Sequence, residues 1–280
     1  TTTLSWQVHS QLYESLTAFD ADGNIVPNLA KSWEISDDGL EVTFVLQEGV
    51  TFHDGTPLNA EAVKYTFDRF IDDATGNPSK ASIGPLTGTE AVDDMTAKMT
   101  FSAPFAPLLS FLTDPFAGII SPTAAEASGE EFGNNPVGSG PFKFVEWVKG
   151  DHITLARFDE YKGFHPMYNH EGPAYLDQVI YRTMPEEQAR IAALETGEVN
   201  MAEPPLEEVV RLQGDGNFIV NIAQNTGQLV FFEFAVHRAP FDDVKVRQAV
   251  GYAVDPAQIV SIGLNDLVQT TQCTVGPGIL

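Results

Sequence analysis

Hydrophobic residues follow two different repeats along this chain, and the two repeats are interleaved irregularly. Residues 40–44 alternate apolar and polar side chains, which predicts a strand with one buried face. Residues 185–199 instead have the pattern of a helix that begins at Pro185 and ends at Gly197. Because strands and helices neither alternate strictly nor separate into blocks, the sequence predicts a mixed α/β (α+β) fold.

The same two repeats predict the remaining elements. Val8, Leu12, Leu16 and Phe19 have helical spacing, which predicts a first helix that ends at the turn residues 20–24. Other strands are predicted within 90–104, 142–147, 152–158, 176–184, 218–223 and 229–236, and other helices over 205–213 and 242–255.

The stretch FHDGTPLNAEAVKYTFDRF, residues 52–70, places a histidine beside an aspartate and raises the question of a metal or acid/base site. Turn residues precede Asn59, which predicts a helix N-cap at that position. His53 and Asp54 are neighbours in the loop, where adjacent side chains diverge, and no second histidine follows at the i+4 spacing of a helical zinc site. We interpret the stretch as a loop that leads into a helix, and we expect no metal.

Length and charge limit the classes of function. The chain has 280 residues, enough for one large domain or two modest ones, and its net charge of −24 would repel a phosphate backbone, so we expect no nucleic-acid partner. A single cysteine, Cys273, excludes a disulfide within the chain. No run approaches about 18 apolar residues, and no basic segment precedes an apolar one at the N-terminus. A mature exported protein and a cytosolic one would both have these properties.

Five motifs in order cover essentially the whole chain and resemble one family. The motifs are YESL (13–16), residues 22–69, NPVGSGPFKFVEW (135–147), LETGEVNMA (194–202) and APFDDVKVRQAVGYAVD (239–255). Together they are similar to the extracytoplasmic solute-binding proteins of ABC transporters, family 5, the oligopeptide, dipeptide and nickel-binding type.

This resemblance implies a periplasmic-binding-protein-like fold of class II, cluster C type, with two lobes that enclose a ligand. Because family members are longer, the chain is expected to contain lobe I, its appended subdomain and the start of lobe II. The expected ranges are 1–45 for the first part of lobe I, 46–165 for the subdomain, 166–238 for the rest of lobe I and 239–280 for the start of lobe II.

The resemblance also implies a function. The protein would be a monomeric substrate-binding component that captures a peptide, a metal chelate or an oligosaccharide and delivers it to ABC permease subunits, without a cofactor. It would be periplasmic or extracellular and membrane-associated, with a lipid anchor in a Gram-positive or archaeal source. Two alternatives stay open: a ligand-sensing module of the same fold, and an enzyme that hydrolyses glycans or peptides.

The candidate ligand contacts lie on the family motifs. Carboxylates would hold a ligand amine, aromatic rings would cover its apolar parts, and backbone groups would bind its polar atoms. The predicted contacts are Tyr13, Glu14, Gly138, Ser139, Glu203, Phe232 and Phe234. Each also has a purely structural interpretation, since Tyr13, Phe232 and Phe234 fit ordinary core spacing, Glu14 has the option of an ion pair, and Ser139 suits a turn.

Other acidic residues test the enzyme alternative. The pairs Asp37–Asp38, Glu207–Glu208 and Asp242–Asp243 are sequence neighbours whose side chains point apart, so we interpret them as turn and helix-start residues.

The chain departs from the family at Gln47, Glu233 and Ala235. An unpaired carboxylate is costly to bury, so Glu233 is expected to be exposed, paired or directed at the cleft.

Overall fold

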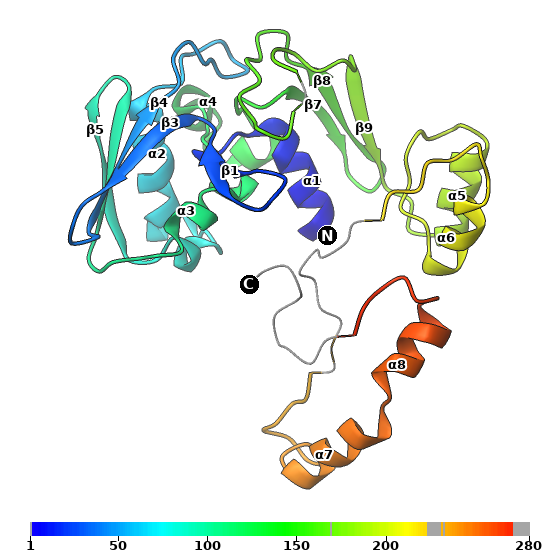
Figure 1. Ribbon diagram of the computed structural model, residues 1–280. Helices are drawn as coiled ribbons and strands as arrows, with labels where there is room; N and C mark the ends of the chain where they lie inside the picture. The colour runs from blue at the N-terminus through cyan, green and yellow to red at the C-terminus, as the bar shows by residue number, and fades with distance from the viewer. Residues whose placement is uncertain (1, 169, 223–230, 232, 271–280) are drawn as a thin grey trace. The chain divides into compact units, whose positions relative to one another are not determined.

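The computed structural model describes residues 2–168, 170–222, 231 and 233–270, with side chains described from residue 5 (Figure 1). The chain packs as two compact units, Thr1–Thr183 and Met184–Leu280. The four ranges expected from the family resemblance remain a prediction. Among the described residues, no helix combines the length and the apolar character that crossing a membrane requires.

The first unit contains a four-stranded antiparallel sheet with the order β3-β4-β6-β5. Its strands are β3 (Ala30–Ile35), β4 (Glu41–Leu46), β6 (Thr96–Phe101) and β5 (Leu86–Asp93), and α2 (Ala60–Ile71) covers one face (Figure 1). Val42, Phe44 and Leu46 of β4 are buried on the α2 side, which confirms the strand predicted over 40–44. This sheet includes strands from both sides of position 45/46, where the sequence analysis places a boundary.

Helix α2 begins where the sequence predicts. The backbone of Asn59 is extended, and its side-chain oxygen accepts a hydrogen bond from the backbone N–H of Ala62 at 3.1 Å. Val63, Phe67 and Phe70 lie on the buried face of the helix and pack in the same core as the sheet. The N-cap and the apolar stripe predicted for this stretch are therefore confirmed.

Replacing Asn59 by alanine should lower the free energy of unfolding of the first unit by about 1 kcal/mol, because one N–H of the first turn loses its acceptor. All three tryptophans, Trp6, Trp33 and Trp147, lie in the first unit, so urea unfolding followed by tryptophan fluorescence reports this unit alone. Asn59→Asp is the matched control, since aspartate retains an acceptor at the cap. Equal losses in the two variants would contradict the capping role.

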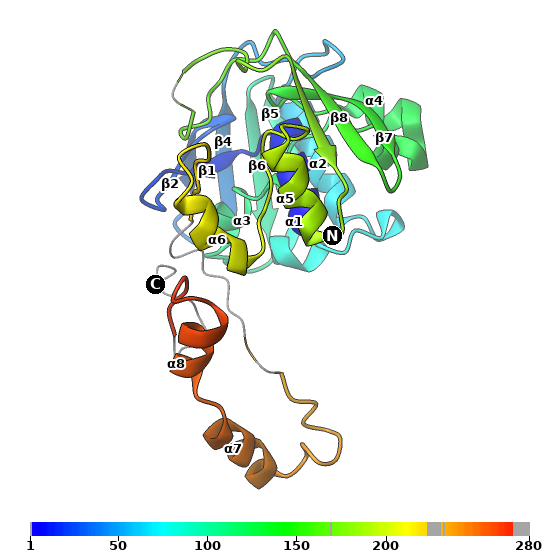
Figure 2. The ribbon, with the colours of Figure 1, turned by 90° about the vertical axis from the view of Figure 1, so that its right-hand side faces the viewer.

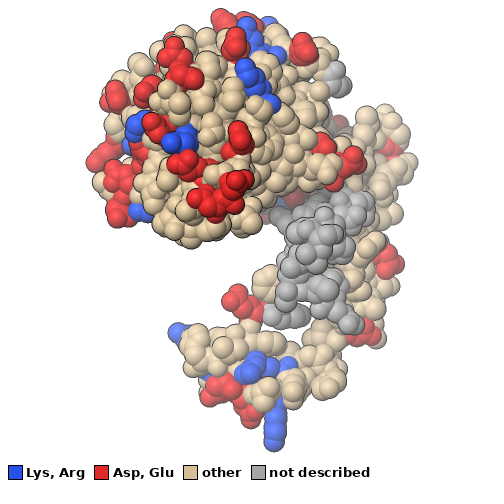
Figure 3. All heavy atoms as spheres, turned by 60° about the vertical axis from the view of Figure 1, so that its left-hand side comes forward, with Lys and Arg blue, Asp and Glu red and all other residues tan. Residues whose placement is uncertain are grey.

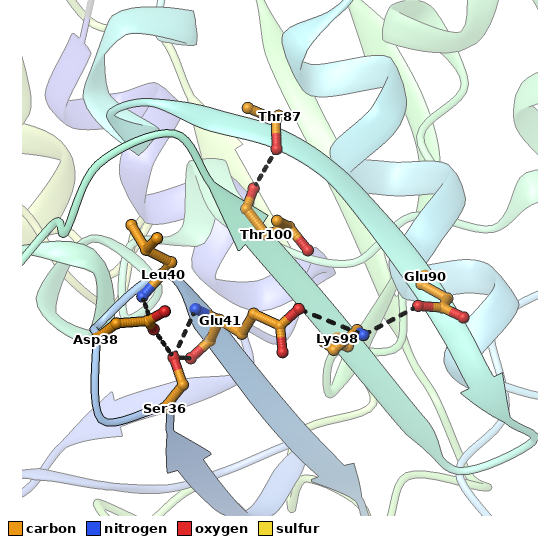
Figure 4. Close-up of polar contacts among 8 residues, drawn as sticks. All are labelled: Ser36, Asp38, Leu40, Glu41, Thr87, Glu90, Lys98 and Thr100. Carbon is orange, nitrogen blue, oxygen red and sulfur yellow. Dashed lines mark hydrogen bonds and ion pairs between the residues drawn. The ribbon is translucent and has the colours of Figure 1, made fainter.

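The other face of this sheet carries polar contacts (Figure 4). Lys98 of β6 lies between two carboxylates of the neighbouring strands, with its Nζ 3.5 Å from Glu41 Oε1 and 3.3 Å from Glu90 Oε2. At the β3-β4 turn, Asp38 Oδ1 accepts hydrogen bonds from the Ser36 hydroxyl at 2.7 Å and the Leu40 N–H at 3.0 Å. The Asp38 carboxylate therefore stabilises a turn, as the sequence analysis expects.

The second sheet of the first unit has the order β7-β8-β9 and is also antiparallel (Figure 2). It consists of β7 (Phe142–Val148), β8 (His152–Arg157) and β9 (Gln178–Arg182), as predicted. Helix α1 (Thr2–Leu12) packs on it through a small core that contains Val8, Leu12, Phe142 and Leu155.

The predicted first helix is too long. The observed helix α1 ends at Leu12. Phe19 belongs to β1 (Thr17–Phe19), which pairs with β2 (Ile25–Pro27) around the predicted 20–24 turn. The backbone of residues 15–17 bonds to other segments instead of continuing a helix: Leu29 N–H donates to Ser15, Ala30 N–H to Leu16, and Thr17 N–H to Leu112. Leu16 therefore fits a helical spacing in the sequence, although its segment is extended and buried.

Short elements complete the first unit. They are α3 (Leu108–Phe111), α4 (Pro122–Ser128), and the 3-10 turns η1 (Asp73–Thr75), η2 (Lys80–Ile83), η3 (Pro115–Ala117) and η4 (Gly129–Asn134). Acidic side chains are spread over the face of this unit that Figure 3 shows, with fewer basic ones among them. The negative charge is distributed there, as expected for a solvated surface.

The second unit contains α5 (Glu187–Glu195), α6 (Leu206–Gln213), α7 (Val244–Ala253), α8 (Pro256–Gln258) and the π-helical turn η5 (Ile259–Gly263). Arg211 connects α6 to α5, with its guanidinium 2.8 Å from Glu195, and it also binds Glu208 within α6 at 2.5 Å. Asp243 caps α7 by accepting the Lys245 N–H at 2.8 Å. Glu208 and Asp243 thus have the structural roles expected of the acidic pairs.

One strand prediction in the second unit is wrong, and another is wrong for the residues that the structure describes. Residues 218–222 form no strand, because a strand requires a hydrogen-bonded neighbour and no described segment of this unit pairs with them. Of the predicted strand 229–236, only residues 231 and 233–236 are described, and these are not in a strand.

Candidate ligand-binding site

The carboxyl group of Glu14 is buried just beyond the end of α1. Glu14 is only 5% exposed, and its two oxygens accept hydrogen bonds from the Ser139 hydroxyl at 3.0 Å and the Tyr161 hydroxyl at 3.0 Å. Ser139 is 1% exposed and Tyr161 is buried too. The carboxyl therefore joins three segments that are far apart in the sequence.

Burial raises the pKa of Glu14 to about 7, and the two hydroxyl bonds only partly oppose this rise. Taking a carboxylate out of water disfavours its charged form unless a cation compensates, and here the partners are neutral hydroxyls. Glu14 therefore changes its charge close to neutral pH, unlike an ordinary surface glutamate.

His53 contacts the loop of residues 138–140, which contains Ser139. The His53 N–H donates to the Gly138 carbonyl at 2.8 Å, the ring Nδ1 accepts the Gly138 N–H at 3.3 Å, and the ring Nε2 contacts the Gly140 carbonyl at 2.9 Å. A ring that accepts at Nδ1 and donates from Nε2 is the neutral Nε2–H tautomer. Burial lowers the pKa of His53 to about 4, which agrees with the neutral form.

Asp54 has a separate structural role. Its carboxylate accepts hydrogen bonds from the Ser121 hydroxyl at 2.5 Å, the Thr56 hydroxyl at 2.6 Å and the Thr56 N–H at 2.9 Å. Asp54 and His53 therefore fix different loops, as their adjacent positions predict. Among the described residues, no three His, Cys, Asp or Glu side chains gather in a way that suits a metal ion.

Glycines let the loop approach the end of α1 closely. A Cβ atom on Gly138 would lie 2.1 Å from the Leu12 carbonyl oxygen and 2.5 Å from Tyr13 Cδ1. On Gly140 it would lie 2.5 Å from the Gln11 oxygen, and the Gly140 N–H donates to Leu12 at 3.0 Å. Backbone proximity therefore requires glycine at positions 138 and 140.

Tyr13 lies between Gly138 and Gly118 and belongs to an aromatic group. A Cβ on Gly118 would lie 2.4 Å from Tyr13 Cβ, so the tyrosine has little room to move. The His9 ring lies 5.6 Å from the Tyr13 ring and 4.8 Å from the Phe116 ring, between centroids. Phe116 and Trp6 are substantially exposed. The aromatic group of His9, Tyr13 and Phe116 therefore adjoins the buried carboxyl of Glu14.

The structure brings four of the seven predicted contacts together: Tyr13, Glu14, Gly138 and Ser139. Glu203 and Phe234 are in the second unit, where Glu203 is exposed and accepts from Arg190 Nε through its backbone carbonyl at 3.2 Å. Phe234 is partly buried and packs on Phe241, with ring centroids 5.1 Å apart. Phe232 lies outside the described residues. Glu233 is exposed, in agreement with the cost of burying its charge.

Sequence reasoning did not identify His9, Phe116 and Tyr161 as parts of this cluster. His9 and Tyr13 are four residues apart in the sequence, a spacing that brings side chains together on one helical face, so this pair was accessible to pattern reasoning. Tyr161 and Phe116 reach the cluster from distant loops and have no local signal. The sequence analysis placed His53 in a loop without a metal, but it did not predict the bonds of His53 to Gly138 and Gly140.

Comparison with known proteins identifies the family. Residues 24–280 match the family described as bacterial extracellular solute-binding proteins, family 5 middle. The chain is 34% identical over 263 residues to the glutathione-binding protein GsiB of Pectobacterium atrosepticum, covering 94% of this chain and 50% of that protein. It is 33% identical over 278 residues to GsiB of Shigella flexneri, covering 99% of this chain and 53% of that protein.

Solved structures have the same fold. The periplasmic binding protein DppA of Helicobacter pylori, in complex with the peptide STSA, matches with a TM-score of 0.79 at 29% identity, over 95% of this chain and 55% of that one. The oligopeptide-binding protein AppA of Bacillus subtilis, in complex with a nonapeptide, matches with a TM-score of 0.81 at 28% identity, over 97% and 53%.

The chain belongs to the family 5 extracellular solute-binding proteins and shares the fold of these periplasmic binding proteins over the matched residues. This confirms both the family and the mixed α/β fold class that the sequence predicts. The chain spans about half the length of the curated relatives that it matches.

Proposed function

We propose that this chain supplies one side of the ligand cleft in the substrate-binding component of an ABC importer. The observation that carries the proposal is the family match over residues 24–280, supported by 33–34% identity to glutathione-binding proteins over nearly the whole chain. The ligand we propose is a small peptide or a peptide-like solute. The permease subunits of the importer are the proposed membrane partner.

In this function the first unit offers the ligand the aromatic group of His9, Tyr13 and Phe116. Glu14, Gly138 and Ser139 fix the position of Tyr13 and the adjoining loop, because their polar groups are already bonded to one another and to the chain. Glu203, Phe232 and Phe234 remain proposed ligand contacts. A ligand that touches both sides of a cleft only in the closed form shifts the population toward closure.

The proposal includes location and chemistry. The protein acts outside the cytoplasm as a monomer, held near the membrane by a lipid anchor in a source that lacks an outer membrane. It releases its ligand unchanged and requires no cofactor.

Native mass spectrometry of the protein expressed from its complete natural gene tests this function. We expect a co-purified small molecule, or saturable binding of glutathione or short peptides, with the same ligand mass recovered after prolonged incubation. Recovery of cleaved or otherwise altered ligand would identify an enzyme, and failure to bind any member of a peptide and chelate panel would contradict the proposed ligand class.

A further inference from the structure

An apolar pocket lies at one end of the four-stranded sheet of the first unit, between the β3-β4 turn and the segment that leads into α3. Its volume is about 180 Å³. The buried side chains of Val42, Phe101 and Leu108 form its floor, and Ile35, which is 50% exposed, lies at its rim. All the lining residues are described, and none has a polar side chain. The pocket therefore suits an apolar group and offers a polar solute no side chain that would fix its orientation.

The volume of the pocket limits the size of the group that it accepts. Cavities of about 150 Å³ lined by Leu, Ile and Phe stay dry and bind benzene. The pocket is therefore large enough for one aromatic ring or one branched aliphatic side chain. A single side chain of this size, inserted into a pocket, is what a partner protein commonly contributes at the centre of an interface.

Contacts within the chain fix the walls of the pocket. At the β3-β4 turn, the Gly39 N–H donates to the Ser36 carbonyl at 2.8 Å, and a Cβ on Gly39 would lie 3.2 Å from Pro104 Cβ. Elsewhere in the wall, a Cβ on Gly84 would lie 2.6 Å from the Phe105 ring, so this ring has little room to move. Because the walls are already in place, filling the pocket costs little conformational entropy.

The surroundings of the pocket are acidic. The pocket is lined from two stretches, 32–63 and 99–142, that contain no lysine or arginine. Asp37 and Asp38 are exposed on the turn beside it. Lys98, which borders the second stretch, already lies between two carboxylates (Figure 4). An apolar group is therefore favoured in the pocket when basic side chains flank it, and disfavoured when it belongs to an anionic molecule.

We propose that this pocket is a docking site for a partner protein, which inserts one aromatic or aliphatic side chain flanked by lysine or arginine. The acidic surroundings would repel nucleic acid and an anionic membrane, and the net charge of −24 opposes docking of a second copy of the chain. The pocket shares no residue with the candidate ligand contacts. The inference therefore goes beyond the proposed function and does not depend on it.

NMR titration of the full chain with short peptides tests the docking site, because it both detects weak binding and locates it. The probe is the peptide KKLKK with blocked ends. Two matched peptides accompany it: KKAKK, which lacks the apolar anchor, and EELEE, which reverses the charges. Only the amide signals of Gly39, Ala106 and Leu109, which line the pocket, are scored, so peptide bound at the candidate ligand contacts does not enter the result.

We expect KKLKK to shift these three amide signals saturably. KKAKK should bind there at least about tenfold more weakly, because it buries no leucine side chain. EELEE should not bind there, because its charges have the same sign as the acidic surroundings.

Substitutions at exposed positions add a second test. Ile35→Lys places a charge at the rim and should weaken KKLKK binding at least about tenfold. Val92→Lys is its matched control, since Val92 is 52% exposed on β5, at the opposite edge of the same sheet, and should bind KKLKK like the unmodified protein. Asp37→Asn should weaken binding about threefold, whereas Asp94→Asn, at an exposed turn next to β5, should not.

Equal binding of KKLKK and EELEE at the pocket amides, or of KKLKK and KKAKK, would overturn the proposal, as would the absence of any shift there. Movement of the same signals with protein concentration alone, or with vesicles of phosphatidylglycerol, would assign the pocket to a second copy or to a membrane and would also overturn it. The peptide comparisons use only the unmodified protein, so they decide the proposal even where a variant does not fold.

Discussion

Replacing Gly138 by alanine should lower the free energy of unfolding of the first unit by about 3 kcal/mol, at the upper end of what overpacking usually costs. The new Cβ would lie 2.1 Å from the Leu12 carbonyl oxygen, a backbone atom that has no rotamer in which to escape. It would also lie 2.5 Å from Tyr13 Cδ1, and Tyr13 is confined on its other side by Gly118. The cost is steric, because Gly138 does not have a positive φ.

Gly133→Ala is the matched control for this substitution, since no atom lies within 4 Å of the position of its new Cβ. We expect it to change the unfolding free energy by less than about 1 kcal/mol. Urea unfolding with tryptophan fluorescence compares the two variants within the first unit. Equal stability of Gly138→Ala and Gly133→Ala would show that the loop does not approach α1 as closely as described.

The second large effect concerns pH. Because the folded protein raises the pKa of Glu14 from its usual 4.5 to about 7, Glu14 contributes stability below pH 4.5 that is lost as the pH rises through 7. This difference in pKa corresponds to about 3 kcal/mol. A glutamine side chain cannot ionise but retains an oxygen acceptor and a donor, so the stability of Glu14→Gln relative to the unmodified protein should improve by about 3 kcal/mol between pH 4.5 and pH 8.

Fluorescence-monitored unfolding at pH 4.5 and pH 8 measures this relative change for both proteins. Glu126→Gln serves as the control, because its carboxyl is exposed, and its difference from the unmodified protein should be the same at both pH values. If the difference for Glu14→Gln were also the same at both values, folding would not raise the pKa of Glu14, and the account of its burial would be wrong.

Much of the fold follows from local sequence patterns. Alternation predicts β4, and turn residues with Asn59 predict the start of α2, because each signal acts within a few residues of its effect. The end of α1 could not be predicted in this way. Leu16 fits a helical stripe, yet its segment is extended because residues 29–30 and Leu112 provide its hydrogen bonds.

The candidate site shows the same division. Family motifs selected Tyr13, Glu14, Gly138 and Ser139, and these four do lie together. The motifs did not indicate that Ser139 would bind Glu14 or that Tyr161 would bind it from 147 residues away, because such contacts depend on how two loops meet. The pKa of Glu14 depends on that burial and could not be read from the sequence.

Calorimetry tests the central claim, that this chain forms one side of a cleft and that tight ligand binding requires an opposing side. The protein from the complete natural gene and the 280-residue chain would each be titrated with the ligand found by native mass spectrometry. We predict saturable binding to the former and binding at least about 100-fold weaker to the latter, because most ligand contacts with a second wall would be lost. Equal affinity of the two would contradict the claim.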